Sequence, residues 1–145
     1  AYLEQLDLRK VARSYLERLS LEVKEIVHLL ILDQGEVVYI DKVENHTQEG
    51  TLRCSSFIGR RASAYSTAAG KVLLSYLPAE VLRSYLVSQK LRPKTEYTIT
   101  SSETLHEQLL EVREKNVLLT ARKTRLASIV WPYRLLIRKG NVSRL

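Results

Sequence analysis

The chain has 145 residues, 45% of them apolar, which suits one globular domain with an ordinary core. Charged residues punctuate its first twenty positions and its single cysteine excludes an internal disulfide, so we expect a soluble cytoplasmic protein without a signal peptide, membrane span, metal or cofactor. The net charge of +7 lies in residues 116–145, which hold seven basic side chains and no acidic one. The neutral remainder argues against a dedicated DNA-binding surface there.

The first predicted elements are a helix and a hairpin. Asp7 is the expected N-cap of a helix whose apolar face repeats every three or four residues. That face consists of Leu8, Val11, Ala12, Tyr15, Leu16 and Leu19. Two β-branched runs, Ile26–Leu32 and Val37–Val43, then flank Asp33, Gln34 and Gly35, which predicts a hairpin with the first run as a central strand. A short third strand is expected at Thr51–Cys54.

Three further helices are predicted. The segment Gly59–Pro78, GRRASAYSTAAGKVLLSYLP, reads as a turn of small residues that opens an apolar helix, whose first N–H groups are free to hold an anion. Pro78 separates it from a second helix, Ala79–Leu86, with an inward face of Val81, Leu82, Tyr85 and Leu86. Thr100 as N-cap and Glu103 begin a last helix to about Lys115, with Leu105, Leu109, Leu110 and Val112 as its apolar residues. Strands are expected at Ala127–Trp131 and Tyr133–Ile137.

The mixture of helices and hairpin-linked strands predicts an α+β domain with helices packed on a largely antiparallel sheet. The order of four segments resembles the effector-binding domain of IclR-type bacterial transcription regulators over roughly residues 7–116. These segments are the first helix, the hairpin that ends in EVVYIDKVE, GRRASAYSTAAGKVLLSYLP and TITSSETLHEQLLEVREKN. The resemblance implies a GAF- or profilin-like sensor that binds a small anionic metabolite, assembles as a homodimer or homotetramer, and reaches DNA only through a separate winged helix-turn-helix domain. That domain is missing from this sequence, so residues 1–7 are interpreted as linker and 8–145 as the effector-binding domain.

The resemblance also implies which residues line the effector pocket. Thr67, Ala68 and Ala69 precede the Gly70–Lys71 pair, where small side chains let a carboxylate approach the helix N-terminus. Cys54 and Ala62 fall on the apolar side of the family's pocket. The alternative is that Ala68, Ala69 and Gly70 allow close packing of the helix on the sheet and that Cys54 is a buried apolar group. Arg60 and Arg61 either attract the anion or are solvated charges or ion-pair partners, and Lys71 is interpreted as structural or interfacial.

The last thirty residues depart from the family pattern. Thr120 and Val130 stand where the family has a pocket aspartate and a pocket cysteine, so both polar contacts would be missing and binding by this chain should be weak or absent. The loss of every acidic residue beyond Glu114 suggests a shifted reading frame, which the nucleotide sequence would test. A divergent tail that binds something acidic remains the other interpretation, and with it a basic nucleic-acid-associated module that uses residues 116–145.

Enzymatic readings find little support in the sequence. There is no GxSxG nucleophile elbow and no GxGxxG, and the phosphate-loop pattern fails because Tyr65 and Val72 replace its glycine and its Ser or Thr. Asp41 with His28 or His46 would be an acid–base pair, but Asp41 lies in a strand pattern. The sequence therefore predicts a ligand-sensing domain with no catalytic residues.

Overall fold

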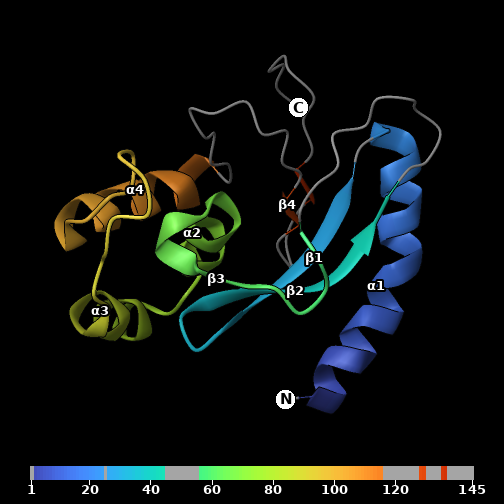
Figure 1. The fold of residues 1–145 in the computed structure, drawn as a ribbon, viewed down its shortest axis with the longest axis horizontal. Helices are drawn as coiled ribbons and strands as arrows, with labels where there is room; N and C mark the ends of the chain where they lie inside the picture. The colour runs from blue at the N-terminus through green and yellow to red at the C-terminus, as the bar shows by residue number, and fades with distance from the viewer. Residues whose placement is uncertain (1, 25, 45–55, 116–127, 130–134, 137–145) are drawn as a thin grey trace. The chain divides into compact units, whose positions relative to one another are not determined.

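The structure, a computed structural model, describes residues 2–24, 26–44, 56–115, 128–129 and 135–136 (Figure 1). Its elements are α1 (Tyr2–Val23), β1 (Val27–Asp33), β2 (Glu36–Val43), β3 (Arg61–Ser63), the 3-10 turn η1 (Ala64–Ser66), α2 (Ala68–Ser75), α3 (Ala79–Ser88), α4 (Ser102–Lys115), β4 (Ser128–Ile129) and β5 (Leu135–Leu136). The α+β prediction is confirmed. The chain forms two compact units, residues 1–31, 38–60 and 123–145 in the first and residues 32–37 and 61–122 in the second.

In the first unit, α1 packs along the β1–β2 hairpin (Figure 1). Leu16 and Leu19 are buried in a cluster with Val27, Leu29, Val38, Ile40 and Val43 of the strands. The helix begins at Tyr2, so the prediction of Asp7 as its cap is wrong; the preceding YLEQL consists mostly of good helix formers that extend the helix. Val11 and Tyr15 are 62% and 60% exposed because they lie on a flank of the buried stripe.

The hairpin prediction is confirmed, with Gln34 and Gly35 both at positive φ in its turn. In the three-stranded sheet the order is β1-β2-β3, so β2 is central and the expectation that the first strand is central is wrong for the described sheet. The partner strand β3 comes from Arg61–Ser63, which the sequence placed in a turn. Tyr39 N–H donates to the Arg60 carbonyl at 3.0 Å at this junction. Thr51–Cys54, the expected third strand, lies outside the described residues.

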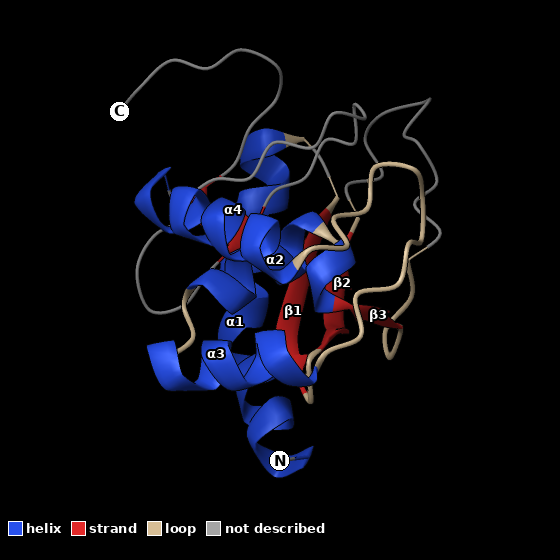
Figure 2. Ribbon diagram, turned by 90° about the vertical axis from the view of Figure 1, so that its left-hand side faces the viewer, coloured by secondary structure: helices blue, strands red, loops and turns tan. Residues whose placement is uncertain are grey.

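The described residues of the second unit include the α-helices α2, α3 and α4, which Figure 2 labels. α2 packs on η1 and α4, and α3 contacts α4. Pro78 separates α2 from α3, as predicted, and is the N-cap of α3. Of the predicted inward face, Val81 is exposed and Leu82 is buried.

The last long helix, α4, starts one residue later than predicted. Ser101 Oγ accepts from Thr104 N–H at 3.3 Å and donates to Glu103 at 2.7 Å, so Ser101 caps α4 rather than Thr100. Leu105, Leu109 and Val112 are buried, whereas Leu110 is exposed. The buried residues are spaced by three or four positions and so share one face of the helix. Leu110 directly follows Leu109 and therefore points away from that face.

β4 and β5 pair antiparallel in a separate two-stranded sheet, with Ser128 opposite Leu136 and Ile129 opposite Leu135. The two strands predicted near the C-terminus are thus confirmed in part. Within the described residues, no helix has the length and apolarity that crossing a membrane requires. The same residues contain no group of three or more His, Cys, Asp and Glu side chains arranged to hold a metal ion.

Candidate functional site

The predicted site centres on the start of α2. Thr67 has an extended backbone, with φ −121° and ψ 147°, and its Oγ1 accepts from Gly70 N–H at 3.1 Å. Lys71 N–H donates to the Thr67 carbonyl at 3.0 Å. In the described part of the chain, the amides of Ala68 and Ala69 therefore remain without an acceptor, as the first amides of a helix do when nothing caps them.

Close packing explains why residue 70 is a glycine. A Cβ added there would lie 2.5 Å from Ala64 Cα and 2.6 Å from Thr67 Oγ1, and it would also collide with the Ala64 carbonyl oxygen. The first turn of α2 thus presses directly on the backbone of η1. Close packing therefore accounts for Gly70, although the helix packs here on η1 and not on the sheet as that interpretation expected.

The structure brings four of the predicted site residues into one stretch of the second unit. Ala62 is half-buried in β3, Thr67 is half-buried at the cap, and Ala68 and Ala69 are each 8% exposed in the first turn of α2. The remaining predicted site residues, Cys54, Thr120 and Val130, lie outside the described residues.

The nearby cations are held by the protein itself. Arg61 donates from Nε to Glu36 at 2.7 Å and from Nη1 to Asp33 at 2.9 Å, and these two hydrogen bonds, Glu36 first, raise the pKa of Arg61. Arg61 therefore ties β3 to the hairpin turn. Lys71 Nζ donates to Gln108 Oε1 at 2.5 Å, and burial lowers the pKa of Lys71. This contact joins α2 to α4, in line with a structural role.

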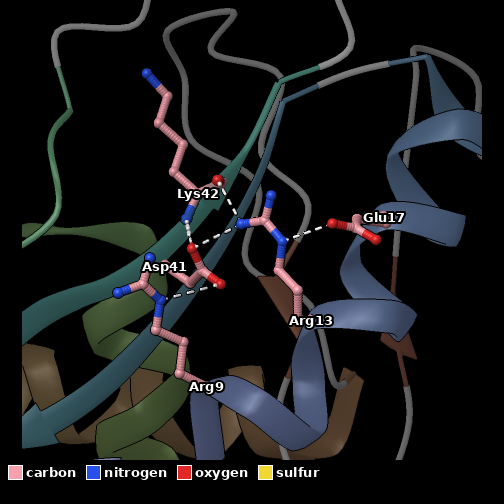
Figure 3. Close-up of polar contacts among 5 residues, drawn as sticks. All are labelled: Arg9, Arg13, Glu17, Asp41 and Lys42. Carbon is pink, nitrogen blue, oxygen red and sulfur yellow. Dashed lines mark hydrogen bonds and ion pairs between the residues drawn. The ribbon is translucent and has the colours of Figure 1, made fainter. Parts of the chain in front are cut away.

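A second polar cluster, in the first unit, was not predicted from the sequence (Figure 3). Asp41 is fully buried, and its Oδ1 accepts from Arg13 Nη1 at 3.0 Å and from its neighbour Lys42 N–H at 2.8 Å. Arg9 Nε lies 3.5 Å from Oδ2, and Arg13 Nε also donates to Glu17 at 2.7 Å. Asp41 is thus a partner of arginines. The sequence signal was the one-turn spacing of Arg9, Arg13 and Glu17.

His28 is engaged elsewhere in the first unit. Its Nε2 lies 2.6 Å from Ser56 Oγ, and its ring meets Tyr39 edge-on with centroids 5.4 Å apart. Burial first, and then the charge of Lys42, lower the pKa of His28, while Glu44 acts in the opposite direction. His28 is therefore a buried neutral imidazole that attaches the segment at Ser56 to β1, and His46 lies outside the described residues.

The lowered pKa of His28 predicts a stability loss on the acid side. Below the ordinary histidine pKa of about 6.5, His28 is protonated in the unfolded chain but still neutral in the native protein. The free energy of unfolding therefore decreases as the pH is lowered from about 6.5, until the lower native pKa is passed. Urea unfolding at about pH 7.5 and about pH 5.5 measures this decline. His28→Gln should flatten it, whereas His106→Gln, at an exposed position of α4, should leave it unchanged. An equal decline in both variants would contradict the assignment.

Comparison with known proteins bears on both units. The family model described as bacterial transcriptional regulator IclR C-terminal matches residues 1–122. The transcriptional regulator KdgR of Escherichia coli is 40% identical over 113 residues, which cover 78% of this chain and 42% of KdgR. The chain spans about two fifths of the length of the curated relatives it matches.

Solved structures give the same grouping. The IclR structure from Thermotoga maritima superposes with a TM-score of 0.67 at 36% identity, covering 75% of this chain and 43% of that one. The inducer-binding domain of the PobR transcription factor from Acinetobacter, a double mutant in complex with 3-hydroxybenzoic acid, has a TM-score of 0.62 at 35% identity. The match covers 72% of this chain and 61% of the PobR domain.

Proposed function

Because the chain belongs to the family of C-terminal domains of IclR-type bacterial transcriptional regulators, we propose that it is a ligand-sensing and oligomerising domain and not an enzyme. Its effector is a small organic acid or sugar acid that binds at the start of α2. DNA is contacted by a winged helix-turn-helix domain outside this chain, and the regulator works in the cytoplasm, where bacterial genes are transcribed. The oligomer is a homodimer or homotetramer, which light scattering of the purified chain tests.

One observation carries the effector proposal: the unpaired amides of Ala68 and Ala69 point out of a helix N-terminus whose third amide is already capped by Thr67. Backbone N–H groups and the helix dipole at such an end favour an anion. Methyl side chains let a carboxylate come close to these amides. The PobR inducer-binding domain, a structural relative, was solved with a carboxylic acid bound, which supports the same class of ligand here.

We expect this chain to bind its effector weakly. Thr120 and Val130 supply neither the carboxylate nor the thiol of the family's pocket, and we attribute the altered tail to a shifted reading frame. Calorimetry with a panel of small carboxylic and sugar acids should then show dissociation constants of about 1 mM or weaker. A chimera in which residues 117–145 are replaced by the corresponding KdgR segment should bind its best acid at least about tenfold more tightly, about 1.4 kcal/mol. Micromolar binding by the unaltered chain would contradict a damaged pocket.

Ala69→Leu in that chimera tests the site itself. An isobutyl group at the first turn of α2 should cover the amides and weaken binding of the best acid by about a hundredfold, about 2.7 kcal/mol. Ala79→Leu, the same substitution at the exposed start of α3, is the matched control and should bind as the chimera does. If Ala69→Leu binds as tightly as its control, the effector lies elsewhere.

The nucleic-acid alternative stays a prediction, since its residues 116–145 lie outside the described residues apart from the four in β4 and β5. A gel shift with unrelated DNA at increasing salt would test it.

A further inference from the structure

Asp41 is an unusual group to find at the centre of the first unit. Its carboxylate is fully buried, and burial of a charge opposes folding unless all its hydrogen bonds are met. Oδ1 has two donors, but Oδ2 has no hydrogen bond within the described structure and lies 3.5 Å from Arg9 Nε. A cluster this incompletely satisfied is a weak source of stability. Its position between α1 and β2 points to another role (Figure 3).

The apolar face of α1 does not fix where the helix sits along the hairpin. Leu8, Ala12 and Leu16, which all contact the core, recur every four residues. Four residues are close to one helical turn, so a slide by one turn puts Ala12 and Leu16 in the places of Leu8 and Ala12, or Leu8 and Ala12 in the places of Ala12 and Leu16. The third place goes to Ser20 in the first slide and to the sequence position of Glu4 in the second. Because two of the three places keep an apolar side chain, this stripe by itself sets the register of α1 on β1 and β2 only weakly.

The charges do not tolerate such a slide. Arg9, Arg13 and Glu17 are also one turn apart on α1. A slide that puts Glu17 in the place of Arg13 sets a second carboxylate beside the buried Asp41, which like-charge repulsion disfavours.

The opposite slide is also disfavoured. It puts Arg9 in the place of Arg13, and the neutral residue Gln5 then takes the sequence position of Arg9. Oδ2 of Asp41 would lose its only neighbouring cation among the described contacts. The present register gives Asp41 both guanidinium groups.

We propose that Asp41 is a positioning residue that sets the register of α1 on the hairpin. Buried polar groups that select one register at some expense of stability are known from helical coiled coils. Arg9 and Arg13 lie on successive turns of α1. By binding both, the Asp41 carboxylate fixes the position of α1 along the direction of β2. Any segment that continues from α1 would then start from a fixed position relative to the strands of the first unit.

The test separates register from stability. In a Cys54→Ser background, spin labels at Leu21→Cys on α1 and at Phe57→Cys in the turn after Ser56 report the distance between the helix and this turn. The turn is hydrogen-bonded to β2 through Tyr39, and both positions are 65% exposed and lie in the first unit. The parent should give one distance. The triple variant Arg9→Met, Arg13→Met, Asp41→Leu should unfold in urea at the parent's concentration or higher, yet show a second distance population shifted by about one helical turn, about 5.4 Å.

Two further variants sharpen the result. Asp41→Asn keeps the volume without the charge and should show the second population as well. Glu17→Gln removes the negative charge beside Arg13 but leaves both arginines on Asp41, so it should keep the single distance of the parent. A single unshifted distance in both the triple variant and Asp41→Asn would overturn the proposal. So would a triple variant that fails to fold, because the cluster would then be needed for stability.

Discussion

Replacing Gly70 with alanine should destabilise the protein by about 3 kcal/mol, because there is no space for the added methyl group. The new Cβ would lie 2.5 Å from Ala64 Cα and would meet the Ala64 carbonyl as well. Both are backbone atoms, which no side-chain rotation can move aside. α2 would have to lift from η1, and the cap from Thr67 to the Gly70 amide would be strained with it. Urea unfolding followed by circular dichroism measures the loss.

Gly59→Ala is the control for this substitution. Gly59 has φ +89°, but nothing lies within 4 Å of a Cβ built there. Its replacement should cost about 1–2 kcal/mol, the backbone penalty of a left-handed conformation alone. A smaller loss at Gly70 than at Gly59 would show that α2 can move away from η1 easily, and close packing would no longer account for the glycine.

Gly70 illustrates what the sequence could predict and what it could not. The turn of small residues before an apolar helix is a local pattern, so the position of α2 followed from the sequence. The same pattern fits both a ligand that approaches the amides and a backbone that packs closely. The collision with Ala64 distinguishes the two for Gly70, because it depends on how η1 folds back under the helix.

The errors concern interactions between segments far apart in the chain. The run Ile26–Leu32 is apolar enough for a central strand, but the order of the described sheet depends on Arg60 and Arg61–Ser63 pairing with β2. Asp41 looked like a strand residue among core neighbours because its partners, Arg9 and Arg13, precede it by about thirty positions. Local periodicity places Arg9 and Arg13 on one face of α1, but it does not show which distant residue they contact.

Boundaries of helices were predicted less well than their existence. Ser101 and Thr100 are equally good caps by residue type, and the choice depends on which hydroxyl meets the Thr104 amide. At Asp7 a favourable cap residue is simply included in a longer helix.

Tyr65→Phe should destabilise the protein by about 1–2 kcal/mol, because one buried hydroxyl makes hydrogen bonds to both backbone groups of Arg92. The Tyr65 side chain is buried, and its OH donates to the Arg92 carbonyl at 2.9 Å and accepts from the Arg92 amide at 3.1 Å. Removal of the oxygen leaves the Arg92 carbonyl without this donor, and the Arg92 amide keeps only its hydrogen bond to the Lys90 carbonyl at 3.0 Å. The loss stays below that of Gly70→Ala because Arg92 is exposed, so water reaches part of the vacated site.

The control for this prediction is Tyr85→Phe, whose hydroxyl lies 3.5 Å from the Gly35 carbonyl and so contributes a weak hydrogen bond. Urea unfolding should show a smaller loss for Tyr85→Phe than for Tyr65→Phe. Amide hydrogen exchange adds a local measurement: the Arg92 amide should exchange faster in Tyr65→Phe and at the parent's rate in Tyr85→Phe. An unchanged Arg92 rate in Tyr65→Phe would mean that the hydroxyl does not hold this loop. Tyr65 stands at the position where a phosphate loop requires glycine. Faster exchange in Tyr65→Phe would give a structural reason for tyrosine there, because its hydroxyl would then be shown to hold the segment after α3 in place.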